Sequence, residues 1–379
     1  MHFDALFLIY STKSIGERMK KIKITAIFGT RPEAIKMCPL IAELKSREAF
    51  DTRVCLTGQH GDMVKSTLRH FDIAYDTDLD IMTRGQSLFD ITERAMVRIK
   101  EELSEHTPHL VLVHGDTSSA FSAALSAFYM GIPIGHVEAG LRTGNIHSPF
   151  PEEFNRVAID AMAELLFCPT QTNLQNLLRE GKSSSACFVT GNTVVDAIKH
   201  TVKNSSEKSS HLRVLITLHR RENLGEPIRR VLRGVLRVVQ KHPSVEFIFP
   251  VHPSPAVGEA VREILSSPPK NLILIKPLEV FSFHRLLSSC HVVLTDSGGL
   301  QEEACALGIP LILARDNTER PEAQGGMTVV GTNEERVFFR LCELIENDSI
   351  RKTMSASPCP FGDGKASKRI ADIIFSKYK

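Results

Sequence analysis

Short runs of Val, Ile and Leu recur along the chain, and a helix-like segment follows each of them. The first half contains the runs KIKITAIFG, TRVCLTG, HLVLVHGD, IPIGHVEAG, LLFCPT and CFVTGN, and the second half contains RVLITLH, VEFIFPVH, NLILIKP, HVVLTDS, PLILAR and MTVVGT. Runs that are apolar at nearly every position are typical of strands covered on both faces. Their alternation with helices predicts an α/β fold with doubly wound parallel sheets and about six strands in each half.

The two series of strands predict two domains of the nucleotide-binding type. We assign residues 21–190 to the N-terminal domain and 191–363 to the C-terminal domain, because a predicted strand ends in TGNT at this boundary. Residues 364–379 carry Ile residues at helical spacing after a Gly/Pro-rich run and predict a closing helix. Residues 1–20 are expected to be an N-terminal extension without signal-peptide character, because they lack a basic leader and a clear cleavage site.

The charge balance argues against a nucleic-acid partner. Lys and Arg total 46 and Asp and Glu total 44, which leaves a net charge of +2, and the chain has no Trp. A nucleic-acid binder more often carries a strongly basic domain or an aromatic stacking surface. No apolar run reaches the roughly 18–20 residues that cross a bilayer, so no membrane partner is expected.

The cysteines indicate a cytoplasmic protein. All eight are scattered, no two form a CxxC pair, and several lie in apolar runs. We therefore expect reduced, buried thiols and neither disulfides nor a metal site.

Polar and charged residues collect directly after the predicted strands, where open parallel sheets bind ligands. Ser297, Gly298 and Gly299 follow one strand and open a helix, so their backbone amides favour an anion such as a diphosphate. Glu303, further along that helix, is placed to accept a ribose diol. The alternative is a tight strand-to-helix turn with an ordinary N-cap.

Basic residues and histidines occupy similar positions. Arg31 follows the first strand and can clamp a phosphate, whereas Lys36 on the next helix could equally be a solvated lysine. His219 and His252 follow neighbouring strands of the second domain, where a histidine can bind phosphate or transfer a proton. A structural role is the alternative for each histidine.

Three acidic positions in the first domain suggest proton transfer. Asp116 follows a strand, Glu138 lies within an apolar run, and Glu152 follows two prolines at a helix start. Burial of a charge calls for a partner or a function. Structural ion pairs are the alternative, with Arg142, Arg156 and Arg220 as counter-ions.

Other catalytic signatures fail. GxGxxG, HExxH and GxSxG do not occur, and FGDGKAS departs from the P-loop spacing. The sequence therefore gives no support for a metal, a cofactor or a serine nucleophile.

Ten segments occur in an order that resembles one enzyme family. They are FGTRPEAIKMCPL, TGQH, VHGDT, GHVEAGLRTG, PFPEEFNR, GNTVVDA, HRREN, PVHP, TDSGGLQEEA and TERPEA, and they run from about Lys21 to the C-terminus. Together they are similar to the non-hydrolysing bacterial UDP-N-acetylglucosamine 2-epimerases. The resemblance implies the glycosyltransferase B-type fold, with two Rossmann-like domains facing a central cleft and the C-terminal helix returning to the first domain. It also implies interconversion of UDP-N-acetylglucosamine and UDP-N-acetylmannosamine by elimination of UDP, through 2-acetamidoglucal, and re-addition.

The family motifs assign roles to the residues that match them. By resemblance, the catalytic residues are Asp116, Glu138, Glu152 and His219. The residues that bind the nucleotide sugar are Arg31, Lys36, Phe283, Ser297, Gly298, Gly299, Glu303 and Arg320. An allosteric site for a second UDP-N-acetylglucosamine would use Gln59, His60 and His252. Gly61 and Asp62 depart from the family pattern beside that site.

Three alternatives share much of this pattern. A hydrolysing epimerase would release N-acetylmannosamine and UDP, and a glycosyltransferase or a non-catalytic nucleotide-sugar binder could share the fold. The three carboxylates favour the epimerase, because a transferase or a binder does not need them. The family habit implies a homodimer.

Overall fold

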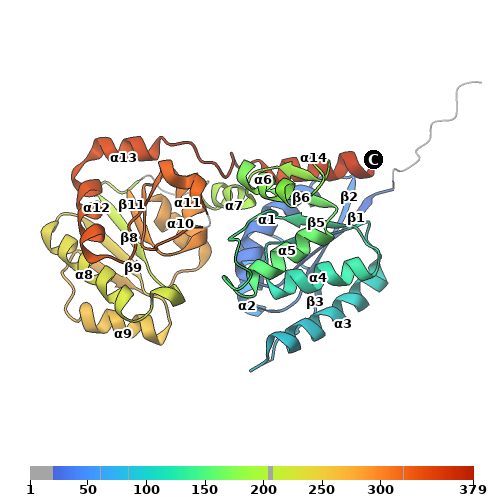
Figure 1. The fold of residues 1–379 in the computed structure, drawn as a ribbon, viewed down its shortest axis with the longest axis horizontal. Helices are drawn as coiled ribbons and strands as arrows, with labels where there is room; N and C mark the ends of the chain where they lie inside the picture. The colour runs from blue at the N-terminus through green and yellow to red at the C-terminus, as the bar shows by residue number, and fades with distance from the viewer. Residues whose placement is uncertain (1–19, 60, 84, 204–207, 319) are drawn as a thin grey trace, which may run out of the picture.

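Two parallel sheets stand side by side, and each is covered by helices on both faces (Figure 1). A computed structural model describes residues 20–59, 61–83, 85–203, 208–318 and 320–379 of the chain. The predicted fold class is confirmed. Almost all of the predicted N-terminal extension, residues 1–19, lies outside the described residues.

The first sheet has the strand order β3-β2-β1-β4-β5-β6-β7. Its strands are β1 (Ile22–Phe28), β2 (Phe50–Leu56), β3 (Thr77–Asp78), β4 (Leu110–His114), β5 (Ile134–Val137), β6 (Leu165–Cys168) and β7 (Cys187–Val189). The six runs predicted for this half all form strands, and β3 is an additional strand. The hydrophobic pattern missed β3, because this edge strand consists of two polar, half-buried residues.

Helices cover both faces of this sheet. They are α1 (Arg31–Lys45), α2 (Gly61–His70), α3 (Leu88–His106), α4 (Ser118–Tyr129), α5 (Glu152–Met162) and α6 (Gln171–Arg179). Ile24, Ala26 and Phe28 of β1 pack with α1 and α2, whereas Ile27 packs with α3 and α4 on the opposite face. This alternation explains why β1 is apolar at almost every position.

The second sheet has the strand order β10-β9-β8-β11-β12-β13. Its strands are β8 (Arg213–Thr217), β9 (Glu246–Pro250), β10 (Leu272–Ile275), β11 (Val292–Thr295), β12 (Leu311–Leu313) and β13 (Met327–Val329). Its helices are α8 (Glu226–Lys241), α9 (Pro255–Ile264), α10 (Val280–Ser288), α11 (Gly298–Ala306), α12 (Glu334–Glu346) and α13 (Asp348–Ser355), with short 3-10 turns at Arg221–Asn223 and Pro321–Gly325.

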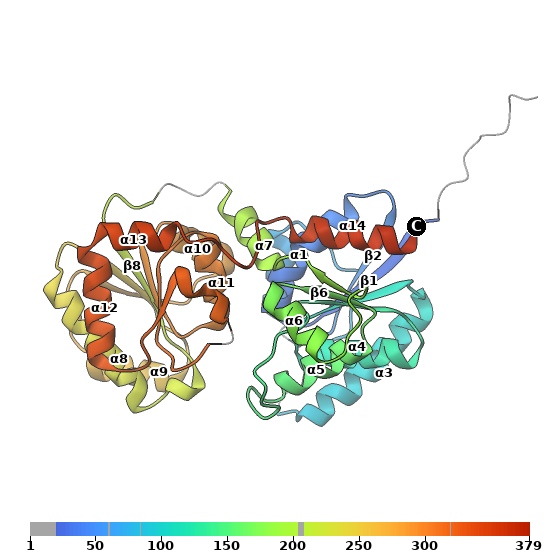
Figure 2. The same cartoon turned by 45° about the horizontal axis from the view of Figure 1, so that its top comes forward.

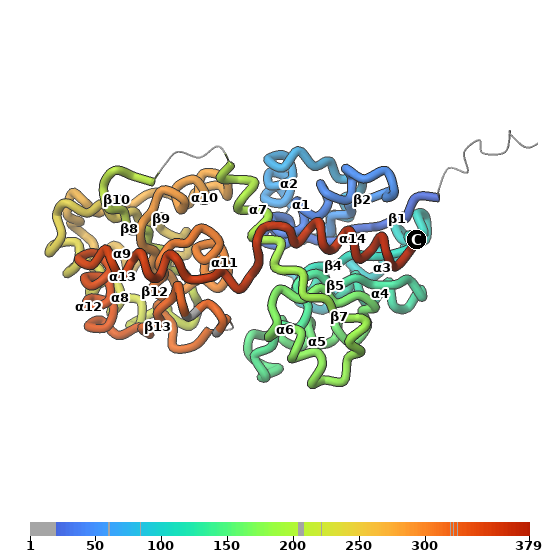
Figure 3. The backbone as a smooth tube through the Cα atoms, turned by 90° about the horizontal axis from the view of Figure 1, so that it is seen from above, coloured from blue at the N-terminus to red at the C-terminus, as the bar shows by residue number. Residues whose placement is uncertain are grey.

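Two helices join the halves. Helix α7 (Thr193–Val202) packs Ala197 into the core of the first domain and Val194, Val195 and Ile198 into that of the second. After the second domain the chain returns to the first domain, where α14 (Ala366–Tyr378) lies along α1 (Figures 2 and 3). Within the described ranges, none of the helices combines the length and the hydropathy that a membrane crossing requires.

The direction of winding reverses at the same point in both sheets. β1 lies between β2 and β4 in the first sheet, and β8 lies between β9 and β11 in the second. Ligands of such sheets bind beyond the carboxyl ends of the strands at this reversal point. The segments that follow β1, β4, β8 and β11 carry the candidate residues Arg31, Asp116, His219 and Ser297.

Candidate functional site

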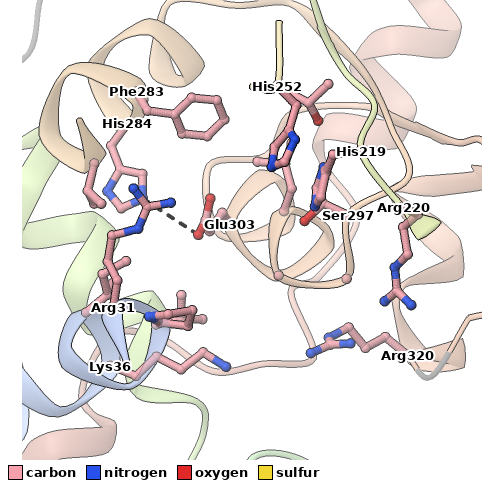
Figure 4. A pocket seen from close by; sticks show the side chains of 18 of the residues that line it. Arg31, Lys36, His219, Arg220, His252, Phe283, His284, Ser297, Glu303 and Arg320 are labelled. Carbon is pink, nitrogen blue, oxygen red and sulfur yellow. Dashed lines mark ion pairs between the residues drawn. The ribbon is translucent and has the colours of Figure 1, made fainter. Parts of the chain in front are cut away.

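A cavity of about 670 Å³ opens between the two domains at these strand ends (Figure 4). All of the predicted catalytic and nucleotide-sugar-binding residues contribute to its lining. They are Arg31, Lys36, Asp116, Glu138 and Glu152 from the first domain, and His219, Phe283, Ser297, Gly298, Gly299, Glu303 and Arg320 from the second.

The buried side chain of Glu33, which is 2% exposed, stabilises the turn between β1 and α1. The backbone amides of Gly29 and Thr30 and the Oγ1 hydroxyl of Thr117 donate to its carboxylate over 2.7–3.1 Å. Burial raises the pKa of Glu33, although these hydrogen bonds oppose the shift. One carboxylate therefore ties the turn that carries Arg31 to the turn that carries Asp116.

Asp116 faces the cavity and is paired with α5. Arg156 Nη2 lies 2.5 Å from Asp116 Oδ2, and Asn155 Nδ2 donates to the Asp116 carbonyl over 2.8 Å. Of the three predicted counter-ions, Arg156 is thus the partner of Asp116. Arg142 instead pairs with Asp160 and Glu180.

Glu138 is a buried carboxylate among donors. Its backbone has a φ of +72°, a strained conformation for a residue with a side chain, and it turns the carboxylate toward the cavity. Lys36 Nζ is paired with Glu138 Oε2, Asn192 Nδ2 donates to the same oxygen over 2.9 Å, and His114 Nε2 lies 3.5 Å away. Burial pushes the pKa of Glu138 up, but Lys36 and His114 outweigh burial and hold it well below its usual value. Glu138 is therefore ionised at neutral pH.

Lys36 also connects the two domains. Its Nζ lies 3.5 Å from Glu302 Oε2 of α11, and Arg320 Nε donates to the other oxygen of Glu302 over 2.6 Å. Burial opposes the charge of Lys36, yet Glu138 and Glu302 raise its pKa. Lys36 is only 9% exposed, so the alternative of a solvated lysine is excluded.

His136 fixes the loops that carry Asp116 and Glu138. Its Nδ1 lies 2.6 Å from Asp160 Oδ1 and its Nε2 lies 2.8 Å from the carbonyl oxygen of Gly115. These two contacts connect the ring to α5 and to the turn that follows β4. The buried ring therefore contacts the residue before Asp116 and lies two positions before Glu138.

Across the cavity from these carboxylates, the N-terminus of α11 forms a candidate anion-binding site, called the diphosphate seat below. Ser297 is the N-cap of this helix, and Arg220 and Arg320 point toward its first turn (Figure 4). A Cβ placed on Gly298 would lie 3.1 Å from Arg320 Nη1 and 3.3 Å from Arg220 Nη2. Free amides and two guanidinium groups together favour a group with the charge and size of a diphosphate.

His219 stands at the edge of this seat. The backbone amides of His219 and Arg220 donate to the buried carboxylate of Asp296 over 3.0–3.1 Å, and the ring stacks on His252 with centroids 5.3 Å apart. Burial, His252 and Arg220 lower the pKa of His219, and Asp296 only partly opposes them. The ring is therefore neutral at neutral pH and can donate one N–H.

The second domain also contributes one aromatic and one acidic side chain to the cavity. Phe283 of α10 forms part of the rim, and Glu303 lies deeper (Figure 4). His284 Nε2 lies 3.7 Å from Glu303 Oε1, while His284 Nδ1 lies 2.8 Å from Thr201 Oγ1. The buried His284 ring thus orients the Glu303 carboxylate.

The predicted allosteric residues come from both domains. His252 lines the cavity. Gln59 Oε1 accepts a hydrogen bond from Ser119 Oγ over 2.7 Å, and His60 lies outside the described residues. Their proposed allosteric role stays a prediction.

Sequence reasoning missed several polar residues that build the site. His114, Asn192, Asp296 and Glu302 were given no role in the site, although each lies inside or beside a quoted motif. For His114, Asn192 and Asp296 the available signal was a polar side chain at a strand end or helix start, whereas Glu302 lies in the middle of α11; all four are buried. The third candidate counter-ion, Arg220, has its Nη1 3.7 Å from Glu222 Oε1, and its Nη2 lies beside Gly298 at the N-terminus of α11.

The chain is similar to known epimerases over most of its length. The family model described as UDP-N-acetylglucosamine 2-epimerase matches residues 42–375. The UDP-N-acetylglucosamine 2-epimerase of Bacillus subtilis is 44% identical over 368 residues, which cover 95% of this chain and 97% of that protein. The crystal structure of the Neisseria meningitidis UDP-GlcNAc 2-epimerase bound to UDP-GlcNAc has a TM-score of 0.87 at 40% identity and covers 93% of this chain and 100% of its own.

A more distant structure supports the fold alone. The glycotransferase of kitacinnamycin has a TM-score of 0.65 at 13% identity and covers 95% of this chain and 100% of its own. The two-sheet architecture is therefore shared with a glycosyl-transferring protein of very different sequence. The family model and the close relatives are decisive: the chain belongs to the UDP-N-acetylglucosamine 2-epimerase family.

Proposed function

We propose that this protein interconverts UDP-N-acetylglucosamine and UDP-N-acetylmannosamine without hydrolysing either. The observation that carries the proposal is the arrangement of the cavity. The carboxylates Asp116, Glu138 and Glu152 lie on one side, and the amide- and arginine-lined seat at Gly298 lies on the other. The relative from Neisseria meningitidis, with UDP-GlcNAc bound, supports the same substrate for this chain.

The reaction needs a base and an acid at C2. In the proposed elimination, a carboxylate takes the C2 proton while the C1–O bond to UDP breaks, which leaves 2-acetamidoglucal and UDP. Protonation of C2 from the opposite face and attack of the UDP β-phosphate oxygen on C1 then give the epimer. Two proton-transfer groups on different sides of C2 are required. The three acids of the first domain provide more than one carboxylate that could exchange a proton with C2.

Glu138 is suited to act as a base, because its pKa lies well below its usual value and its carboxylate is ionised at neutral pH. Asp116 is paired with Arg156 and is half-buried. Glu152 makes no ion pair with any described residue, so its carboxylate is free to exchange a proton with the substrate.

The second domain would stabilise the departing UDP. Negative charge grows on the β-phosphate as the C1–O bond breaks, and preorganised donors are most effective where charge develops. The helix N-terminus at Gly298 with Arg220 and Arg320 provides such donors, and the neutral His219 can donate an N–H to the leaving oxygen. Glu303 would accept the ribose hydroxyls, and Phe283 would pack against the uracil.

The test is incubation with UDP-N-acetylglucosamine in deuterated water, followed by NMR at C2 and by analysis of the products. We expect deuterium at C2 in a mixture of two UDP-linked epimers. Free N-acetylmannosamine and UDP would identify a hydrolysing epimerase instead. A C2 proton that never exchanges would overturn the epimerase proposal in favour of a transferase or a binder.

We further infer that the protein acts as a homodimer. Large apolar side chains are exposed on α3, α4 and α5, and they are Phe89, Val97, Phe128, Tyr129 and Phe154, with exposed fractions of 45–87%. Exposed apolar side chains gathered on neighbouring helices favour association. A symmetric contact between two copies would cover this face and leave the cavity accessible.

The proposed setting is the cytoplasm, where the product would supply N-acetylmannosamine for cell-surface polysaccharide. The eight cysteines are all free thiols in the structure, and six of them are buried. Free thiols are the usual state in a reducing compartment.

A further inference from the structure

The C-termini of α8 and α12 meet on the second domain, away from the cavity, and three side chains with metal-binding atoms converge there. His242 follows the last residue of α8, and Cys342 and Glu346 lie one turn apart at the end of α12. Nδ1 or Nε2 of His242, Sγ of Cys342 and a carboxylate oxygen of Glu346 all lie within 4.8 Å of one another. We propose that these residues form a binding site for a divalent transition-metal ion of the Zn²⁺ class.

The donor set fits such an ion. An imidazole nitrogen, a thiolate sulfur and a carboxylate oxygen are the three ligand types that Zn²⁺ takes in proteins. With Cys342 and Glu346 ionised and His242 neutral, two negative charges balance one divalent cation. Water would complete a four-coordinate shell.

The surroundings also favour a cation. Both helix C-termini direct partial negative charge to this point. His242 Nε2 is buried and makes no hydrogen bond to any described residue, although it lies 3.3 Å from Glu346 Oε1. A buried imidazole nitrogen without a hydrogen-bond partner is costly unless another ligand takes it.

The site is rigid enough to be preformed. Cys342 is 4% exposed and packs in the core between α8 and α12. Asn271 Nδ2 donates to the carbonyl oxygens of Val239, His242 and Val245 over 3.0–3.1 Å, which fixes the chain around His242.

Lys241 is the competitor for this site. Its Nζ lies 2.8 Å from Glu346 Oε1, and its side chain is half exposed. The ammonium therefore occupies the place of a cation beside Glu346 and Cys342. Metal binding would move the Lys241 side chain into solvent, and the Cys342 thiol would release its proton as the metal–sulfur bond forms.

The experiment is a titration of the full-length protein with Co²⁺ under reducing, anaerobic conditions, read by absorption spectroscopy. We expect one equivalent to give a thiolate-to-cobalt charge-transfer band with tetrahedral d–d bands, and Zn²⁺ to displace it. The band should persist in the Cys187→Ser control, whose thiol lies in the first domain, and vanish in Cys342→Ser.

A second pair of variants keeps the result interpretable. Lys241→Gln should tighten the Co²⁺ dissociation constant at least about tenfold, since it removes the competing charge, and His242→Asn should weaken it. Circular dichroism and UDP binding should stay unchanged in every variant and report the fold independently of the cavity. A band that survives in Cys342→Ser, or the lack of any band in both wild type and Lys241→Gln, would overturn the proposal.

Discussion

Lys36 Nζ of the first domain lies 3.5 Å from Glu302 Oε2 of the second while it is also paired with Glu138. A single buried ammonium therefore joins the carboxylates of both domains. It keeps Glu138 ionised and holds the two walls of the cavity together.

Lys36→Met should damage both activity and stability. Two buried carboxylates lose their shared cation, so we expect the pKa of Glu138 to rise and the acid limb of the pH–rate profile to move to higher pH. Turnover should fall about 10²–10³-fold, and unfolding should become easier by roughly 3 kcal/mol. Lys45→Met, at the exposed end of the same helix, is the matched control for kinetics and denaturation. Near-normal turnover in Lys36→Met would show that the pair is not needed.

Asp116→Asn should separate chemistry from binding. The amide cannot exchange the C2 proton as a carboxylate can, so turnover and deuterium exchange should fall at least about 10²-fold. UDP affinity, measured by calorimetry, should stay within about threefold, because the diphosphate seat lies in the other domain. Asp51→Asn, an exposed position on β2, serves as the control. Lost UDP binding in Asp116→Asn would contradict this division of roles.

His219 should make stability depend on pH in a defined direction. Its pKa in the folded protein lies below the ordinary value of 6.5, so the unfolded chain takes up the proton first as the pH falls. The contribution of the neutral ring is fully present above pH 6.5 and is lost as the pH falls from there to the lower folded pKa. The measurement is the unfolding free energy of wild type minus that of His219→Asn across this window. A difference that grows toward acid pH would be the wrong sign.

Gly298→Ala should weaken UDP binding without unfolding the protein. The new methyl group would lie 3.1 Å from Arg320 Nη1 and 3.3 Å from Arg220 Nη2 and push both guanidinium groups away from the seat. We expect about a tenfold loss of UDP affinity, with stability within about 1 kcal/mol of wild type. Gly258→Ala is a close control, since its methyl group would lie 3.3 Å from Arg262 Nη1 on α9, outside the cavity. Unchanged affinity in Gly298→Ala would argue that the diphosphate binds elsewhere.

Tyr129→Glu should dissociate the proposed dimer. Tyr129 is 70% exposed on α4, and a carboxylate there would be desolvated in a symmetric contact. Light scattering after gel filtration should give the mass of one chain for this variant and of two for wild type. Phe339→Glu, at an aromatic side chain of the second domain that is 63% exposed, should remain dimeric. A monomeric wild type would rule the dimer out.

The amino-acid sequence predicted most of the fold but only part of the candidate site. Near-continuous apolar runs such as those of β1 and β4 predict buried parallel strands, whereas the two polar residues of β3 carry no such signal. Strand ends pointed to Asp116, Glu138, His219 and Ser297. The partners that fix these side chains, such as Glu302 and His136, follow no local pattern, because they act through distant contacts.

Periodicity determined the two-domain α/β architecture, and the motifs determined which residues could meet a nucleotide sugar. Both signals are local, since strand and helix patterns repeat within a few residues. Tertiary structure alone decided the charge of the site: Lys36 became a buried bridge and Glu138 an ionised carboxylate because residues from far apart in sequence surround them. The same holds for His242 and Cys342, which lie one hundred positions apart in the chain and become neighbours only when α8 packs on α12.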